Sequence, residues 1–519
     1  MNKCLKAFVG LTLMIFVTGS YAGAKDVVET KGFGWKPSLE NLVNIKAVEF
    51  HQKMLQKIAD RNDGNRAAGT SGYEKSVQYM SFMLSLSGFD VTQQDFEFPF
   101  FQVVSDPEFE QTAPTPTVYP ADGFATMTYS GSGNVTAPVE YVDVVLPPAP
   151  DPNTSNSGCE ATDFDAFTAG NIALVQRGSC SFYDKAMNAQ NAGAVAVIIF
   201  NEGQDGRQDA IVGTLGAPEF TIPVIFSSFA IGNELADAID ANGGPGAVQV
   251  RVKTDTLSEI RVTQNVIAES KSGDPANTVV LGGHLDSVLA GAGINDNGSG
   301  CATLLEAAMK LGWFHTKLTN KVVFAFWGAE ELGLIGSEFY VNNLTPEELA
   351  NIKLYLNFDM VASPNYVRFV FDGDGSDTGI SGPPGSDFIE QWFVDFFGDK
   401  LLATDPTALD GRSDYEPFML AGIPVGGLFT GAGDLKTEEQ AAIYGGTAGE
   451  PYDKYYHTEN DTSANINFEV EEQMLKAIAA AVQFFSENSL PAAAPSIQSF
   501  STKAAKGYDL DFKGPLAVK

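Results

Sequence analysis

Four strand-like segments occupy the C-terminal half of the chain, and helical stretches separate them. The segments are NTVVLGGH (277–284), KVVFAFWG (321–328), KLYLNFDM (353–360) and GIPVGGLF (422–429). Short apolar runs that alternate with helical stretches are typical of a sheet covered by helices. Because α/β sheets build their sites at the carboxyl ends of the strands, the residues that follow these segments are the first candidates for function.

Side chains that bind metals stand at or near these strand ends. They are His284, Asp296, Glu330, Glu331, Asp359 and His457. Each has an ordinary explanation when taken alone; two glutamates in the first turn of a helix, for example, are favoured by the helix dipole. Together, without a cation, the carboxylates would repel one another in a partly dehydrated pocket. The set therefore predicts a metal site, whereas His51 and His315 lie in helical or surface-like contexts and are expected to be structural.

Composition and apolar periodicity divide the chain into two domains. Apolar residues recur at helical spacing in residues 44–60 and 73–88, which begin an α/β domain that we assign to residues 36–110 and 256–488. Residues 111–255 are rich in Pro, Gly, Thr and Val and contain short β-like runs, which indicates an inserted β-rich domain. Residues 489–519 are rich in Ala, Pro and Ser and are expected to form a C-terminal extension.

The first 24 residues have the pattern of a cleaved secretory signal. Two lysines precede an apolar run (7–17), and the small residues AGA (22–24) follow it. That run is shorter than the roughly 20 residues needed to span a bilayer, and no later segment is long and apolar enough. We therefore expect a secreted protein. Its 65 acidic and 32 basic residues give a net charge of -33, which argues against nucleic acid or an anionic membrane as a partner.

The cysteines fit an oxidising compartment. Cys4 lies in the signal, and Cys159 and Cys180 are close enough in sequence to form a disulfide. Cys301 lies in the helix-like segment GCATLLEAAMKLG, where we expect a buried and inert thiol.

Six motifs carry a resemblance to a known family. GGHLDS, INDNGSG, WGAEELGLIGS, LNFDM, DGRSDYEPF and YYHTEND resemble, in order and spacing, the secreted two-zinc aminopeptidases of the leucyl aminopeptidase and aminopeptidase Y type, over residues 40–488. Residues 158–201 are similar to the protease-associated domain that is often inserted in that family. The resemblance implies a three-layer helix–sheet–helix zinc exopeptidase domain with a mixed, mostly parallel sheet.

The resemblance also implies a role for each candidate ligand. His284 and Asp359 would bind one zinc ion, Glu331 and His457 the other, and Asp296 would bridge the two. Zinc accepts imidazole nitrogen and carboxylate oxygen, so these residue types suit the assignment.

The remaining assignments concern catalysis. Glu330 would be the general base, Tyr456 would donate a hydrogen bond to the oxyanion, and Asp286 would orient His284. Arg412 corresponds to a family position beside the substrate, although a surface ion pair would explain it nearly as well. The resemblance further implies a cis peptide bond between Asp296 and Asn297.

One departure from the family and two rival functions remain. Many bacterial relatives have a cysteine pair around the last histidine, whereas this chain has Tyr455 and Asn460, so something else must hold the His457 loop. The resemblance implies a monomeric enzyme that acts on peptides with a free N-terminus and favours apolar residues there. A carboxypeptidase or glutaminyl cyclase on the same fold is one rival, and a non-catalytic receptor-like homologue is another.

Overall fold

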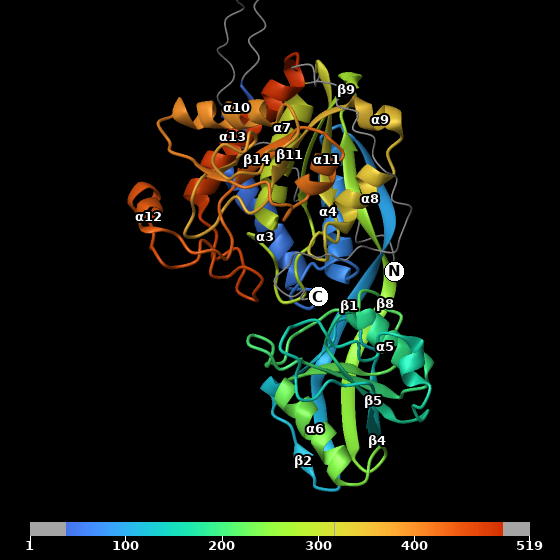
Figure 1. The fold of residues 1–519 in the computed structure, drawn as a ribbon. Helices are drawn as coiled ribbons and strands as arrows, with labels where there is room; N and C mark the ends of the chain where they lie inside the picture. Colours follow the sequence, from blue (N-terminus) through green and yellow to red (C-terminus); the bar gives the residue numbers. More distant parts are fainter. Residues whose placement is uncertain (1–37, 316, 491–519) are drawn as a thin grey trace, which may run out of the picture. The chain divides into compact units, whose positions relative to one another are not determined.

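The computed structural model describes residues 38–315 and 317–490, and a mixed sheet forms the middle layer of its α/β domain (Figure 1). The strands of this sheet, in spatial order, include β13 (Asp405–Thr407), β12 (Phe369–Phe371), β14 (Val425–Phe429), β11 (Ile352–Phe358), β9 (Asp274–His284), β10 (Asn320–Trp327) and β8 (Gln249–Glu269). The neighbours from β14 to β10 run parallel, while β12 pairs antiparallel with β14 and β8 with β10. The predicted mixed, mostly parallel sheet is confirmed.

Helices cover both faces of this sheet. One layer contains α2 (Leu39–Leu42), α3 (Ile45–Ala59), α4 (Ser71–Leu86), α7 (Gly298–Phe314), α10 (Ser386–Gly398) and α13 (Phe468–Glu487), which pack into one large apolar core. The other contains α8 (Ile335–Asn342), α9 (Pro346–Asn351) and α11 (Tyr415–Leu420), around the buried Trp327. A further helix, α12 (Glu438–Tyr444), precedes the His457 loop. The expected three layers are therefore present.

The sequence accounts for the first long helix in simple terms. Asn44 caps α3 by accepting a hydrogen bond from the backbone N–H of Lys46 (2.9 Å). Buried residues then recur at helical spacing, with Val48, Leu55 and Ala59 facing the core. The apolar residues whose spacing predicted this helix thus form its buried face.

Two long strands lead into and out of the inserted domain. β1 (Asp90–Ala113) pairs antiparallel with β8 from Asp90–Glu269 to Ala113–Gln249. The predicted domain limits at residues 111 and 255 fall inside these continuous strands. The rest of the domain comprises β2 (Thr117–Val118), η1 (Ala121–Gly123), β3 (Phe124–Thr126), β4 (Gly133–Tyr141), η2 (Ala161–Phe164), β5 (Ile172–Gln176), α5 (Phe182–Asn191), β6 (Ala196–Phe200), β7 (Val224–Ser227) and α6 (Phe229–Ala241). The structure joins Cys159 to Cys180 in this domain.

The remaining histidines and Cys301 are buried. His51 and His315 are not on the surface: His51 Nδ1 lies 2.6 Å from the Tyr79 hydroxyl, and His315 Nδ1 lies 2.9 Å from Glu487 Oε1. Burial lowers the pKa of His51 to about 4. Burial also raises the pKa of the Cys301 thiol to about 12, as expected of an inert cysteine.

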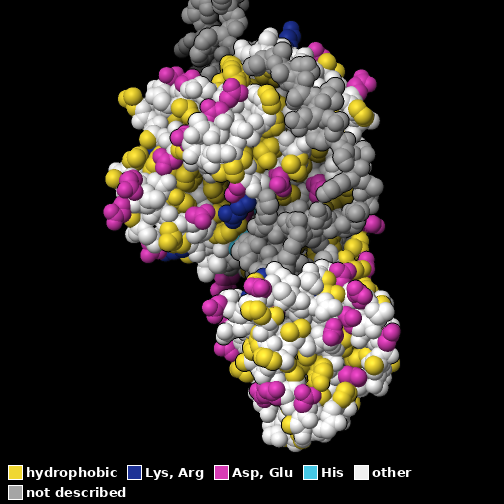
Figure 2. All heavy atoms as spheres, in the orientation of Figure 1, with side chains coloured by type: hydrophobic (Ala, Val, Ile, Leu, Met, Phe, Trp, Pro, Cys, Tyr) yellow, Lys and Arg dark blue, Asp and Glu magenta, His cyan; other side chains and the backbone are white. Residues whose placement is uncertain are grey.

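The surface agrees with the acidic composition. Figure 2 shows acidic side chains spread over the visible face and few basic ones. None of the helices in the described residues is long and apolar enough to cross a membrane. The predicted signal (1–24) and residues 491–519 of the predicted extension lie outside the described residues.

Candidate metal centre

Three neighbouring parallel strands deliver candidate ligands to one edge of the sheet. His284 is the last residue of β9, and Asp359 directly follows β11. Glu330 and Glu331 lie in the loop after β10, the strand beside β9. Because α8 begins only at Ile335, the glutamates are not in the first turn of a helix, and the helix dipole does not account for them.

Asp296 enters from the loop between β9 and α7. The peptide bond from Asp296 to Asn297 is cis, as the resemblance implied. Asn297 then caps α7, since its Oδ1 accepts a hydrogen bond from the backbone N–H of Gly300 (3.0 Å). The loop thereby ends at the start of a buried helix, with the Asp296 side chain beside the strand ends.

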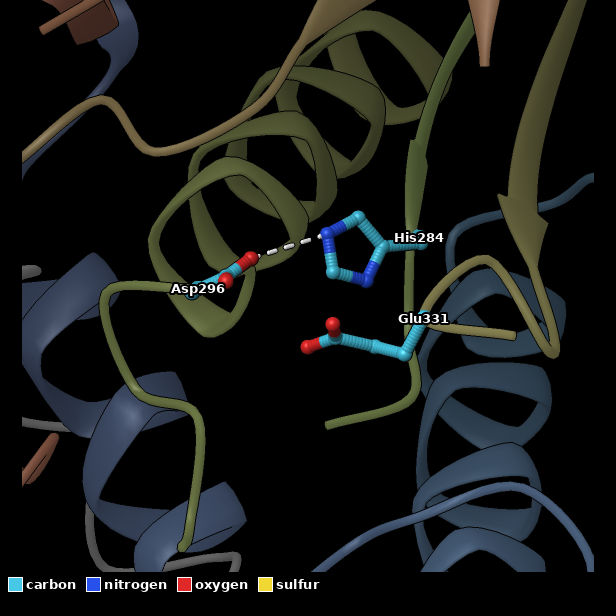
Figure 3. Close-up of side chains that lie close together, drawn as sticks. All are labelled: His284, Asp296 and Glu331. Atoms are coloured by element: carbon cyan, nitrogen blue, oxygen red, sulfur yellow. Dashed lines mark ion pairs between the residues drawn. The ribbon is translucent and has the colours of Figure 1, made fainter. Parts of the chain in front are cut away.

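The two carboxylate oxygens of Asp296 face different histidines. Its Oδ1 lies 3.0 Å from His284 Nε2, and its Oδ2 lies 3.2 Å from His457 Nε2. Each histidine also has a carboxylate of its own: Asp359 Oδ1 is 3.2 Å from His284 Nε2, and Glu331 Oε2 is 2.9 Å from His457 Nε2. The arrangement is therefore two imidazole–carboxylate pairs with one shared carboxylate. Figure 3 shows the Asp296 and Glu331 carboxylates in the space that the His284 ring faces.

The donor set fits a divalent cation. Oxygen and nitrogen atoms of His284, Asp296 and Glu331 lie within 4.8 Å of one another, as do those of His284, Glu330 and Asp359. In the described part of the chain, Oε1 of Glu331 is buried without a hydrogen-bond partner, which a protein tolerates where an ion completes the site.

Burial and neighbouring charges shift the pKa values of the groups in this centre. Burial alone would lower the pKa of His284, but Glu330 and Asp359 outweigh it and raise that pKa well above its usual value. Burial opposes a charged His457 too, yet Asp296 and Glu331 raise its pKa to about 10. Burial raises the pKa of Glu331 to about 7 and that of Glu330 well above its usual value. The centre therefore holds protons that a cation would displace.

Comparisons with known proteins identify the family. The model of peptidase family M28 matches residues 265–482, and that of the PA domain matches residues 135–235. An aminopeptidase of Pseudomonas aeruginosa is 45% identical over 461 residues, which are 87% of this chain and 84% of the relative. The chain belongs to peptidase family M28. A protein of Aspergillus fumigatus named "probable leucine aminopeptidase 2" is 38% identical over 499 residues, 93% of each chain.

Solved structures agree on the fold. The aminopeptidase from Aneurinibacillus sp. strain AM-1 superposes with a TM-score of 0.61 at 25% identity, over 88% of this chain and 97% of that one. A zinc aminopeptidase from Bacillus subtilis gives a TM-score of 0.56 at 24% identity, over 86% and 96%. This M28 chain is thus a peptidase with an inserted PA domain.

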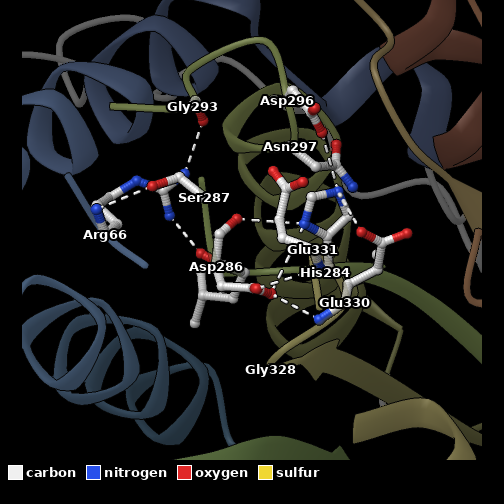
Figure 4. Close-up of polar contacts among 12 residues, drawn as sticks. Arg66, His284, Asp286, Ser287, Gly293, Asp296, Asn297, Gly328, Glu330 and Glu331 are labelled. Carbon is white, nitrogen blue, oxygen red and sulfur yellow. Dashed lines mark hydrogen bonds and ion pairs between the residues drawn. The ribbon is translucent and has the colours of Figure 1, made fainter. Parts of the chain in front are cut away.

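Asp286 holds the glutamate loop as well as the histidine strand (Figure 4). The backbone N–H groups of Glu330 and Glu331 donate to its Oδ1 (3.2 Å) and Oδ2 (3.4 Å). Its Oδ1 is 3.7 Å from His284 Nδ1, whereas its own carbonyl oxygen is closer, at 3.2 Å. The predicted orienting role toward His284 therefore falls partly to the Asp286 backbone, and the carboxylate fixes the two glutamates.

The M28 centre opens into a pocket. Met360, Phe371 and Phe429 contribute apolar side chains to its lining. Tyr456 also lines it and stacks on the His457 ring, with 3.8 Å between ring centroids. Burial raises the pKa of Tyr456, so its hydroxyl keeps its proton and can donate. Arg412 lines the pocket too, but its side chain is 46% exposed and lies 4.0 Å from the Asp434 carboxylate.

Four residues of the site surroundings were missed from the sequence. Ser413 donates a hydrogen bond to Asp359 Oδ2 (2.7 Å), and its place in the DGRSDYEPF motif was a usable signal. The others are Arg66, Asp453 and Asp461, which hold the loops of Asp296 and His457. Asp461 ends the YYHTEND motif, which was a usable signal, whereas Asp453 and Arg66 lie outside the six motifs.

Proposed function

We propose that this M28 chain is a secreted zinc aminopeptidase that binds two zinc ions and releases single residues from the free N-terminus of peptides. The position of Asp296, with one oxygen toward each histidine, carries the proposal. Zinc takes imidazole and carboxylate ligands at about 2.0–2.2 Å, and paired zinc ions lie about 3.5–4 Å apart. His284 and Asp359 would hold one ion and Glu331 and His457 the other, with Asp296 shared.

Two side chains beside these ligands would move protons and stabilise charge. Bound zinc supplies a polarised carbonyl and a water of lowered pKa. Glu330, which is 9% exposed with its Oε2 3.9 Å from His284 Nε2, would take the proton from the attacking water and pass it to the leaving amine. The protonated Tyr456 hydroxyl would donate to the oxygen on which negative charge develops.

The lining of the pocket supports the choice of substrate. Glu330 and Asp359 offer carboxylates to an N-terminal ammonium group. Met360, Phe371 and Phe429 offer apolar surface to the first side chain, in keeping with a preference for residues such as leucine. A carboxypeptidase would need cationic groups for a C-terminal carboxylate, and the described lining has Arg412 alone, beside Asp434.

Secretion rests on two features of the chain. The signal-like pattern of residues 1–24 supports it. The Cys159–Cys180 disulfide supports it as well, since such bonds persist in oxidising compartments.

The test compares leucine p-nitroanilide with its N-acetylated form on the zinc-loaded enzyme. The acetyl cap removes the ammonium charge, so the free substrate should be cleaved at least about a thousandfold faster in kcat/KM, which is about 4 kcal/mol of transition-state stabilisation. Equal cleavage of the two substrates would make the enzyme an endopeptidase or amidase. Release of C-terminal residues from a peptide would favour the carboxypeptidase alternative instead.

A further inference from the structure

The Asp296 loop, residues 285–297, joins β9 to α7 without a helix or strand of its own. The His457 loop, residues 453–461, is likewise irregular. His457 itself has a φ of 57°, a left-handed conformation that a non-glycine residue keeps only where its surroundings impose it. If Asp296 and His457 are to hold one ion between them, other contacts must fix these two loops to each other.

Arg66 fixes one side of the Asp296 loop (Figure 4). Its side chain is fully buried, and its guanidinium donates to three backbone carbonyls of this loop. Nε donates to Ala292 O (2.9 Å), Nη2 to Gly293 O (2.6 Å) and Nη1 to Leu285 O. Because all three nitrogens bind carbonyls of one loop, the guanidinium sets the shape of that loop.

Asp461 fixes the other side of the same loop. It is 3% exposed, and its Oδ1 and Oδ2 accept hydrogen bonds from two consecutive amides, those of Asn295 (2.7 Å) and Asp296 (3.0 Å). Asp453 adds a third bond, since its Oδ2 accepts from the side-chain amide of Asn295 (2.7 Å). The two aspartates stand at the two ends of the His457 loop, so each bond ties that loop to the backbone that carries Asp296.

We propose that Asp461 and Asp453 are positioning residues that lock the His457 loop to the Asp296 loop, and that they set the affinity of the zinc ion held by Glu331 and His457. The inference rests on the proposed function, since it requires that His457 and Asp296 share a zinc ion. Neither aspartate lines the pocket, and neither belongs to the proposed ligand set.

The experiment measures zinc binding to Asp461→Asn by competition with a chelator. The substitution preserves size but leaves one acceptor oxygen for two amides, so we expect one of the two zinc ions to bind 10- to 100-fold more weakly. The other ion, which shares only Asp296 with it, should be weakened less. Asp453→Asn, which loses a single bond to Asn295, should weaken the same ion by less. It also serves as the test if Asp461→Asn does not fold.

Glu471→Gln is the matched control for the loss of a buried carboxylate. Glu471 is fully buried, and its side chain accepts from Gln52 on α3 rather than from a residue of the centre. This control should bind both zinc ions with wild-type affinity. If both aspartate variants also keep wild-type zinc affinity while the zinc-free protein melts at a lower temperature, the two residues are merely structural and the inference is overturned. A wild-type protein that binds no zinc would instead overturn the proposed function.

Discussion

The adjacent glutamates should separate metal binding from proton transfer when each is changed to glutamine. Glu330→Gln keeps the shape of a side chain that lies 3.9 Å from His284 Nε2 but cannot accept a proton. We expect both zinc ions to remain and kcat to fall by about 10²- to 10⁴-fold, the usual loss for a general base. At about 1.36 kcal/mol per tenfold, the transition state loses roughly 2.7 to 5.4 kcal/mol of stabilisation.

Glu331→Gln should instead cost metal. Its Oε2 lies 2.9 Å from His457 Nε2, and its buried Oε1 has no hydrogen-bond partner among the described residues, so both oxygens are placed for an ion. Elemental analysis after dialysis would measure zinc per chain, and leucine p-nitroanilide would give kcat and KM. The assignment is refuted if both variants lose the same amount of zinc, or if Glu330→Gln keeps more than a tenth of the wild-type kcat.

Two further predictions concern stability. Burial raises the pKa of Glu471 well above its usual value, so the folded state favours the protonated acid. The contribution of the protonated acid to the free energy of unfolding is complete below the unfolded pKa near 4.5. It declines by up to about 1.4 kcal/mol per pH unit as the pH rises toward the folded pKa. Glu471→Gln should therefore raise the melting temperature at pH 8 relative to wild type and change it little at pH 4, and a shift of equal size at both pH values would contradict this. Replacing Cys159 and Cys180 by alanine opens a loop with a sequence separation of 21, which should lower the free energy of unfolding of the inserted domain by about 3 kcal/mol; denaturant unfolding with no change in midpoint would contradict it.

The strand ends could be predicted because their chemistry is local. His284 ends an apolar strand and Asp359 directly follows one, so the sequence predicts both the strand and the side chain at its end. Parallel neighbours then bring such ends together without further information. The family resemblance added the assignment of the ligands to two zinc ions, which no single segment of the sequence indicates.

The partners of two of the supports, Arg66 and Asp461, could not be predicted, because these partners are backbone atoms. Arg66 binds three carbonyl oxygens and Asp461 two amide groups, and every residue of a chain offers such groups. Only the folded path of the Asp296 loop decides which ones meet the side chain. The predicted domain limits at residues 111 and 255 mark a change in composition, while the pairing of β1 with β8 continues across them.

Two adjacent glutamates can serve different roles because the backbone before them is fixed. Ala329 has a φ of 57°, and a Cβ on Gly328 would lie 2.4 Å from the Tyr73 hydroxyl, so the chain turns tightly against its neighbours before the pair. Asp286 then binds both glutamate amides, one on each oxygen. With the two peptide planes held, the side chains diverge, Glu330 toward His284 and Glu331 toward His457. A single glutamate could not reach both positions, so the proposed division between a base and a ligand requires the pair.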